Sequence, residues 1–147
     1  VWLYTVWTHS LCVLLLSTMT YTFTIHGNQE NVFANPVPYH RTTQGSTWAP
    51  AAKRYNAWKH YVRTCLYKQC RVNVQLAEPL TLSKKTTATM DIVIQWANGT
   101  HGDCDNVFKG IADALFTNDK YLTHGSFSSE MSKSKQGKVL VTITLHG

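Results

Sequence analysis

Acidic side chains are scarce in this sequence and unevenly placed. The chain has eight Asp and Glu residues against fourteen Lys and Arg residues, which gives a formal net charge of +6 at pH 7. Between Glu30 and Glu78 there is no acidic residue, while these basic residues accumulate: Arg41, Lys53, Arg54, Lys59, Arg63, Lys68 and Arg71. Positive charges gathered this way repel one another unless an anion is bound. The run therefore favours contact with nucleic acid over a merely solvated basic face.

A cysteine framework is also lacking. The four cysteines, Cys12, Cys65, Cys70 and Cys104, include no C-x-x-C pair and show no regular spacing. Their pattern argues against a disulfide-stapled secreted domain and indicates a reducing compartment, which predicts a cytoplasmic protein. One alternative stays open, a zinc site that combines His101 with the last three cysteines, because those spacings loosely resemble metal-ligand spacings.

The first twenty residues contain no Asp, Glu, Lys or Arg, yet they fit no targeting signal well. A signal peptide wants a basic start and small residues at a cleavage site. A membrane span wants about twenty apolar residues, whereas Thr, Ser and His interrupt this stretch. The clean strand pattern that starts at Met19 favours a third interpretation. We expect residues 1–18 to be a leader or upstream extension, residues 19–147 to form the domain, and no membrane partner.

The remaining length suits one domain with a substantial core, since 44% of all residues are hydrophobic. Apolar periodicity predicts, in chain order, a strand at 21–26, a helix from Pro50, a strand at 86–97, a helix at 106–116, and strands at 120–127 and 138–145. A long loop at 27–49 and a polar turn at 128–137 separate them. The fold class predicted from this order is α/β (α+β), a single domain with one mixed sheet and two main helices.

The first predicted helix is amphipathic. Pro50 suits a first helical turn, and apolar residues then recur at spacings of three and four: Ala51, Tyr55, Trp58, Val62 and Leu66. The basic residues of this segment fall largely off that stripe. We therefore expect a helix that packs on the core and presents a basic outer face.

Four of the eight carboxylates lie in one window, from Asp103 to Leu122. Asp103 and Asp105 point the same way in an extended loop just past a predicted strand, and Asp105 suits the cap of the helix that follows. Lys109 comes one helical turn after Asp105, on the same face. Two carboxylates can hold a hard cation and a lysine beside them can hold a phosphate, which suits phosphodiester hydrolysis. A capped helix with surface aspartates is the competing interpretation.

The other two aspartates of the window are harder to place. Asp113 lies one turn beyond Lys109, and we expect an ion pair between those two side chains. Asp119 would lie about 20 Å from Asp105 if the helix ran straight to it. It can join the same ion only if the chain folds back after Phe116 or if a second subunit supplies it.

The order Asp103-Cys104-Asp105-Asn106, then Lys109, then Asp113-Ala114-Leu115, then Asn118-Asp119 resembles the RusA family of Holliday-junction resolvases. The pattern of that family is D-x-D-N-x-x-K, a D-A-(L/M) segment, and a D-D pair before a strand. The likeness covers nearly all of residues 19–145. It includes the strand after Met19, the entry Trp48-Ala49-Pro50 into the first helix, and the last strand.

The resemblance implies a homodimeric endonuclease that uses Mg²⁺ to cut opposed strands of a four-way junction or other branched DNA, in recombination and repair. It implies that Asp103, Asp105 and Asp119 are catalytic, metal-binding carboxylates and that Lys109 is the essential lysine. We expect these residues to contact backbone phosphates: Arg41, Lys53, Arg54, Lys59, Arg63, Lys84, Lys85, Lys133 and Lys135. Asn118 stands where the family has the first Asp of its pair, so the alternative is a catalytically inactive junction-binding protein of the same fold.

Overall fold

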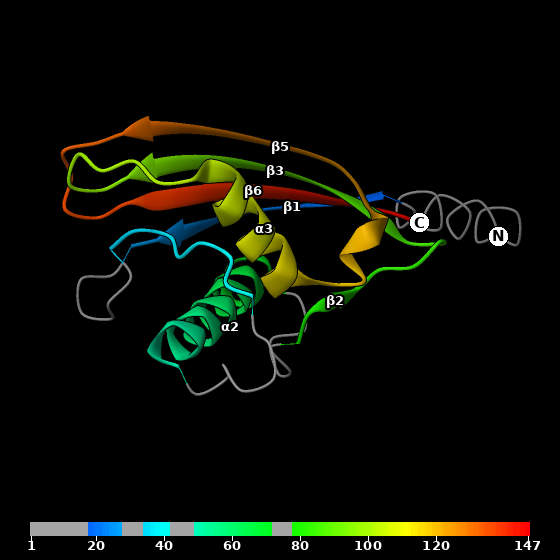
Figure 1. Cartoon of the computed structure of the whole chain (residues 1–147). Coiled ribbons are helices and arrows are strands. Elements are labelled where there is room, and N and C mark those ends of the chain that lie inside the picture. The colour runs from blue at the N-terminus through cyan, green and yellow to red at the C-terminus, as the bar shows by residue number, and fades with distance from the viewer. Residues whose placement is uncertain (1–17, 28–33, 42–48, 72–77) are drawn as a thin grey trace, which may run out of the picture.

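The computed structural model describes residues 18–27, 34–41, 49–71 and 78–147 (Figure 1). Within them two helices and a mixed four-stranded sheet form one domain, as the periodicity predicted. Nearly all of the expected leader, residues 1–17, lies outside this description. None of the helices in the described ranges is long and apolar enough to span a membrane.

The sheet has the strand order β1, β6, β3, β5. The first strand, β1 (Thr18–His26), and the last, β6 (Lys138–His146), are antiparallel neighbours. β6 also pairs antiparallel with β3 (Thr87–Trp96), and β3 pairs in parallel with β5 (Leu122–Met131). β6 and β3 therefore fill the middle of the sheet, while β1 and β5 form its two edges.

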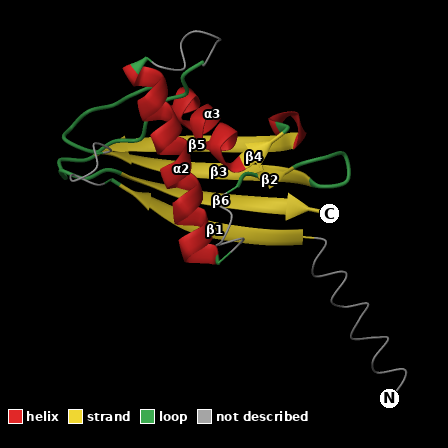
Figure 2. Cartoon of the chain, turned by 90° about the horizontal axis from the view of Figure 1, so that it is seen from below, coloured by secondary structure: helices red, strands yellow, loops and turns green. Residues whose placement is uncertain are grey.

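Both helices cover the same face of the sheet (Figure 2). α2 (Pro50–Cys70) crosses the strands, and α3 (Cys104–Leu115) lies beneath β5 and β3. A short parallel pair, β2 (Leu80–Thr81) with β4 (Phe116–Thr117), and a 3₁₀ turn, η1 (Asp119–Tyr121), complete the order. Both helices thus reach the sheet from one side.

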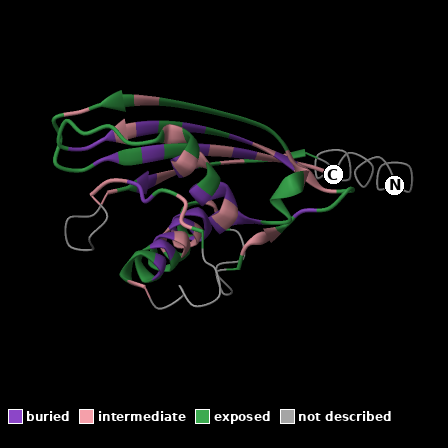
Figure 3. Cartoon of the chain, viewed as in Figure 1, coloured by how far each residue is buried: buried purple, intermediate pink, exposed green. Residues whose placement is uncertain are grey.

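The core lies between that face and the helices, because alternate strand residues point toward it. Along β3 the residues Ala88, Met90, Ile92, Ile94 and Trp96 are buried, and their neighbours face the uncovered side of the sheet. Figure 3 shows the same alternation on β6. From α2 the buried side chains include Tyr55, Trp58, Val62 and Leu66, all four of which the apolar stripe predicted.

Two predicted details are wrong. Ala52 is buried and Ala51 is exposed, since the helix presents the position one residue later to the core. β5 runs to Met131, whereas a polar turn was expected from residue 128. Pairing with β3 keeps the chain extended there despite its Ser and Glu side chains, because an edge strand can leave those side chains in water.

Candidate active site

A tight turn at the end of β3 sets the position of the acidic loop. Asn98 and Gly99 both adopt positive φ, 58° and 65°, a region that Asn and Gly tolerate best. Their backbone N–H groups donate to the carbonyl oxygens of Ser134 and Ser132 at 2.8 and 2.7 Å. The turn after β3 is therefore fastened to the turn after β5, and the loop that leads to Asp103 starts from a fixed base.

Asp103 and Asp105 lie at the very start of α3. The helix begins at Cys104, because the Asp103 carbonyl oxygen already accepts the N–H of Val107 at 3.1 Å. Asp103 is thus the N-cap residue and Asp105 belongs to the first turn, so the prediction that Asp105 caps a helix starting at Asn106 is wrong. The Asp103 side chain makes no capping hydrogen bond. Both carboxyl groups stay at the surface.

Asn106 connects the two carboxyl groups. Its side-chain Nδ2 donates to Asp103 Oδ2 at 2.9 Å, and its backbone N–H donates to Asp105 Oδ1 at 2.9 Å. A hydrogen bond between the two carboxyls raises the pKa of Asp103 above its usual value. Two acids close enough to share a proton repel each other when both ionise, and a bound cation relieves that repulsion.

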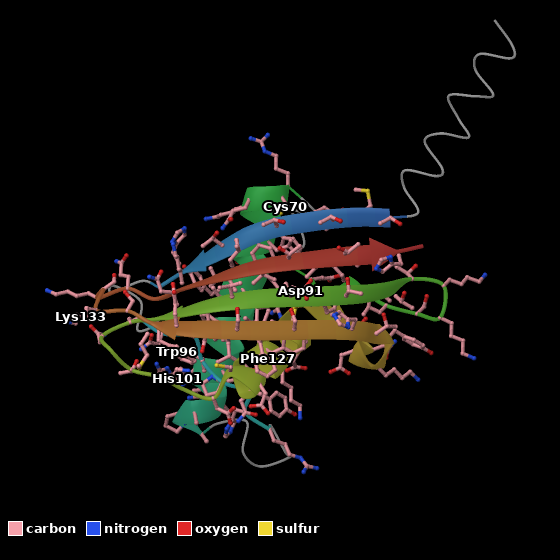
Figure 4. All side chains as sticks on the ribbon, turned by 90° about the horizontal axis from the view of Figure 1, so that it is seen from above. Cys70, Asp91, Trp96, His101, Phe127 and Lys133 are labelled. Carbon is pink, nitrogen blue, oxygen red and sulfur yellow. The ribbon has the colours of Figure 1, made fainter. Side chains whose placement is uncertain are left out.

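A second contact ties the acidic loop to the edge strand. Ser129 of β5 accepts a hydrogen bond from Cys104 Sγ at 3.1 Å, and its hydroxyl lies 2.9 Å from His101 Nε2. Figure 4 shows His101 beside Trp96, near the same end of the sheet as Lys133. The loop is therefore held on both sides of Asp103.

Lys109 is the next charged residue of α3. It is exposed and lies one turn after Asp105, so it shares that face of the helix. Its Nζ lies 4.2 Å from the ring centre of Tyr39, within the range of a cation–π contact. Tyr39 belongs to the segment 34–41, whose backbone reaches α3 through a hydrogen bond from Tyr39 N–H to Asn106 O at 3.0 Å.

Asp113 does not pair with Lys109 in the structure, so that prediction is wrong. Its carboxylate accepts a hydrogen bond from the Tyr55 hydroxyl at 2.6 Å and lies 3.4 Å from Lys59 Nζ. Burial, and then the bond to Asp113, raise the pKa of Tyr55 far above its usual value. Asp113 therefore joins α3 to α2. Its role is structural, as expected, but its partners differ from the expected one.

Asp119 lies beyond the other end of α3. The helix has 12 residues and so spans about 18 Å, and η1 follows it beside the start of β5 (Figure 1). The chain turns back toward the acidic loop only along β5, after Asp119. In the described part of the chain no three His, Cys, Asp or Glu side chains gather, and so Asp103, Asp105 and Asp119 of one subunit do not form one cluster.

A family model, that of endodeoxyribonuclease RusA, matches residues 31–144. The chain belongs to this family. RusA-family proteins are endodeoxyribonucleases, which hydrolyse phosphodiester bonds of DNA and act on branched junctions. No curated protein sequence matches the chain significantly. The family match includes the whole window from Asp103 to Leu122.

The acidic pair of this RusA-family chain fits a divalent cation. Its two carboxyls are exposed and both accept hydrogen bonds from Asn106, and the Asp103 side chain does not cap the helix. Mg²⁺ is bound in many sites through one or two carboxylates while it keeps several waters. The zinc alternative has no such support: His101 and the three cysteines form no cluster in the described residues, and burial raises the pKa of the Cys65 thiol.

The four residues of the RusA-family α2 that were expected to contact DNA divide into two groups. Lys59 and Arg63 are partly buried and face α3, where Lys59 pairs with Asp113 and Arg63 Nη1 donates to the Ala114 carbonyl oxygen at 3.2 Å. Lys53 and Arg54 are exposed, as the predicted basic face requires. Half of the expected basic face thus holds the two helices together.

The lysines of the loops lie at opposite ends of the sheet. We call Lys133 and Lys135 the proximal lysines, because their turn is bonded to the turn that leads to Asp103. We call Lys84 and Lys85 the distal lysines, because their turn precedes β3. Ten residues of β3 separate the two turns, which is roughly 33 Å.

Three further residues contribute to the site, although no role there was predicted for them. Asn106 stands inside the D-x-D-N motif, so its position already marked it. Tyr39 and Ser129 come from segments far away in the chain, a loop and an edge strand. Nothing in their local sequence shows that they meet α3.

Proposed function

We propose that this RusA-family chain is a Mg²⁺-dependent endonuclease that cuts Holliday junctions in opposed strands, in recombination and repair. The observation that carries the proposal is the pair of exposed carboxyls of Asp103 and Asp105 at the start of α3, both bonded to Asn106, with Lys109 one turn after Asp105. Hydrolysis of a phosphodiester requires carboxylates that bind a metal ion and, beside them, a positive side chain that binds the phosphate.

Each residue has its own part in this proposal. Asp103 and Asp105 would hold the ion, and Asn106 fixes the two carboxyls relative to each other through its two hydrogen bonds. A divalent ion supplies positive charge that polarises the scissile phosphate and activates water. Lys109 brings a second positive charge to the phosphate as negative charge develops in the transition state.

Exposed basic residues of the chain offer the contacts for DNA. The proximal lysines, together with Arg41, Lys53 and Arg54, are exposed. Contacts of this kind give salt-dependent affinity for the phosphate backbone without reading bases. Lys59 and Arg63 are left out of this surface, because both are engaged with α3.

A homodimer is part of the proposal. A two-fold dimer presents two equivalent sites to a junction that is itself two-fold. Asp119 lies past the far end of its own α3, and we assign it to the acidic pair of the second subunit. In this proposal Asp119, which the family motif marks, would reach the ion from the second subunit.

The deciding experiment is cleavage of a synthetic four-way junction with one labelled strand at a time. We expect paired nicks in opposed strands with Mg²⁺, none with EDTA, and none on a linear duplex of the same sequence. Asp105→Asn should leave the junction intact. Asp91→Asn is the matched control, because Asp91 is exposed on the uncovered face of the sheet, where it bonds to Ser126. Wild-type protein that never cuts, or Asp105→Asn that cuts as wild type does, refutes the proposal.

A catalytically inactive junction-binding protein is the second candidate. The absence of a third carboxylate from the described acidic cluster of a single chain favours it. It requires junction binding that weakens with salt but ignores divalent ions, and no nicked product at any concentration of Mg²⁺ or Mn²⁺. Gel-shift titrations run beside the cleavage assay separate the two candidates.

A further inference from the structure

Tyr39 meets Lys109 where two distant segments cross. The segment 34–41 runs over α3, and Gly110 makes that approach possible: a Cβ there would lie 3.2 Å from Tyr39 N and 3.4 Å from the Val37 carbonyl oxygen. A hydrogen bond from Tyr39 N–H to Asn106 O adds a fixed point on the first turn of the helix. The backbone of Tyr39 is therefore set relative to the acidic pair.

The ring of Tyr39 is set as well. It packs edge-on against the ring of Tyr55, with centroids 5.7 Å apart and an interplanar angle of 79°. Tyr55 is 1% exposed, and its hydroxyl is bonded to Asp113. A buried residue of α2 thus helps to fix the Tyr39 ring over which the Lys109 ammonium lies.

A ring and a carboxylate hold a lysine differently. A carboxylate cancels the charge of the ammonium, whereas an aromatic face attracts it and leaves the positive charge and its N–H donors free. Lysine also has four rotatable bonds, and restricting them before substrate arrives lowers the entropic cost of the reaction. Lys109 needs both properties if it is to meet a phosphate.

We infer that Tyr39 is a positioning residue that holds Lys109, as a charged and accessible ammonium, at the acidic pair. The inference rests on the proposed function, since it gives a partner to the lysine of that site. It assigns to the segment 34–41 a part in the cleavage step itself, beyond any contact that this segment makes with DNA. Tyr39 acts through Lys109 and need not touch the reacting phosphate.

The test compares Tyr39→Leu with Tyr39→Phe in single-turnover cleavage of the four-way junction at saturating protein. Loss of a cation–π contact should slow Tyr39→Leu by about 3- to 30-fold, while Tyr39→Phe, which keeps the ring, should stay within about twofold of wild type. Junction affinity measured in EDTA should change little in either variant. Tyr61→Leu, which removes a half-buried tyrosine of α2, is the control for a general loss of packing.

A double-mutant cycle separates positioning from structure. In a Lys109→Met background, Tyr39→Leu should have no further effect on the cleavage rate, because the side chain it positions is gone. Equal fold losses in both backgrounds overturn the inference, as does a Tyr39→Phe variant that is as slow as Tyr39→Leu. In either case wild-type cleavage would leave the proposed function standing.

A second readout needs no catalysis. Protons on the Lys109 side chain near the Tyr39 ring should show upfield-shifted NMR resonances in wild type and in Tyr39→Phe, and ordinary positions in Tyr39→Leu. Ordinary positions in wild type overturn the contact and the inference together. A wild-type protein that shows the shift but never cleaves refutes the proposed function and removes the role in cleavage, while the contact stands.

Discussion

Replacing Asp113 should lower stability and spare catalysis. The Asp113 carboxylate accepts a hydrogen bond of 2.6 Å from the hydroxyl of Tyr55, whose side chain is buried. Hydrogen bonds to charged groups contribute about 1.5–3 kcal/mol. The ion pair with Lys59 adds about 0–1 kcal/mol, because the two side chains are 22% and 39% exposed and water screens them. Asp113→Ala should therefore cost about 2–4 kcal/mol of unfolding free energy.

Asp113→Asn isolates the charge from the hydrogen bond. An amide oxygen can still accept from Tyr55, so this variant should lose roughly half as much stability. Tyr55→Phe combined with Asp113→Ala should show a coupling energy of about 1–2 kcal/mol, because both changes remove the same bond. Urea unfolding followed by circular dichroism measures wild type, the three single variants and the double variant. A thermal melt should show Tm lowered by about 10 °C for Asp113→Ala.

Cleavage assays on the same variants complete the test. At 25 °C, where Asp113→Ala stays folded, its single-turnover rate should lie close to that of wild type. A variant as stable as wild type that no longer cuts would refute the reasoning, since Asp113 would then belong to the reaction and not to the helix–helix contact. The opposite pattern, low stability with full activity, is the expected one.

Three further predictions concern the site and its surroundings. Asp105→Asn and Asp119→Asn proteins should each be inactive alone. Refolded together they should nick junctions, because one site of the heterodimer then has both aspartates. A mixture that stays inactive would place Asp119 in the site of its own subunit or outside the site. Alanine at both proximal lysines should weaken junction binding in a gel shift, and flatten its salt dependence, more than alanine at both distal lysines does. Equal effects of the two double variants would contradict the assignment of the DNA surface. Gly110→Val should push the segment 34–41 off α3 and slow cleavage by about tenfold, whereas unchanged cleavage would show that the crossing is irrelevant to the reaction.

Local spacing was sufficient for the residues that share one helix. Lys109 follows Asp105 by four residues, so helical geometry brought these two side chains to one face. Asp103 precedes the helix and is linked to Asp105 through the two hydrogen bonds of Asn106. The same rule failed for Asp113, whose partners Tyr55 and Lys59 come from another helix. Spacing along the chain carries no signal for a contact between residues more than fifty positions apart.

Tertiary pairing also decided where elements end. Polar residues after Phe127 predicted a turn, yet pairing with β3 extends β5 to Met131. The N-terminal limit of α3 shifted for a similar reason, since the loop before Asp103 is fixed by contacts with β5 and its turn. Such boundaries depend on backbone partners that periodicity does not identify.

The place of β6 in the sheet has a consequence for how the protein is made. β6 is the last described strand in the chain, yet it lies between β1 and β3 and is the neighbour that pairs with β1. During synthesis, β1 therefore leaves the ribosome more than a hundred residues before its partner exists. The sheet can close only after residues 138–146 emerge, so we expect slow, late folding governed by this long-range pairing. A nascent chain that stops before Lys138 would leave β1 and β3 with open edges for chaperones to cover.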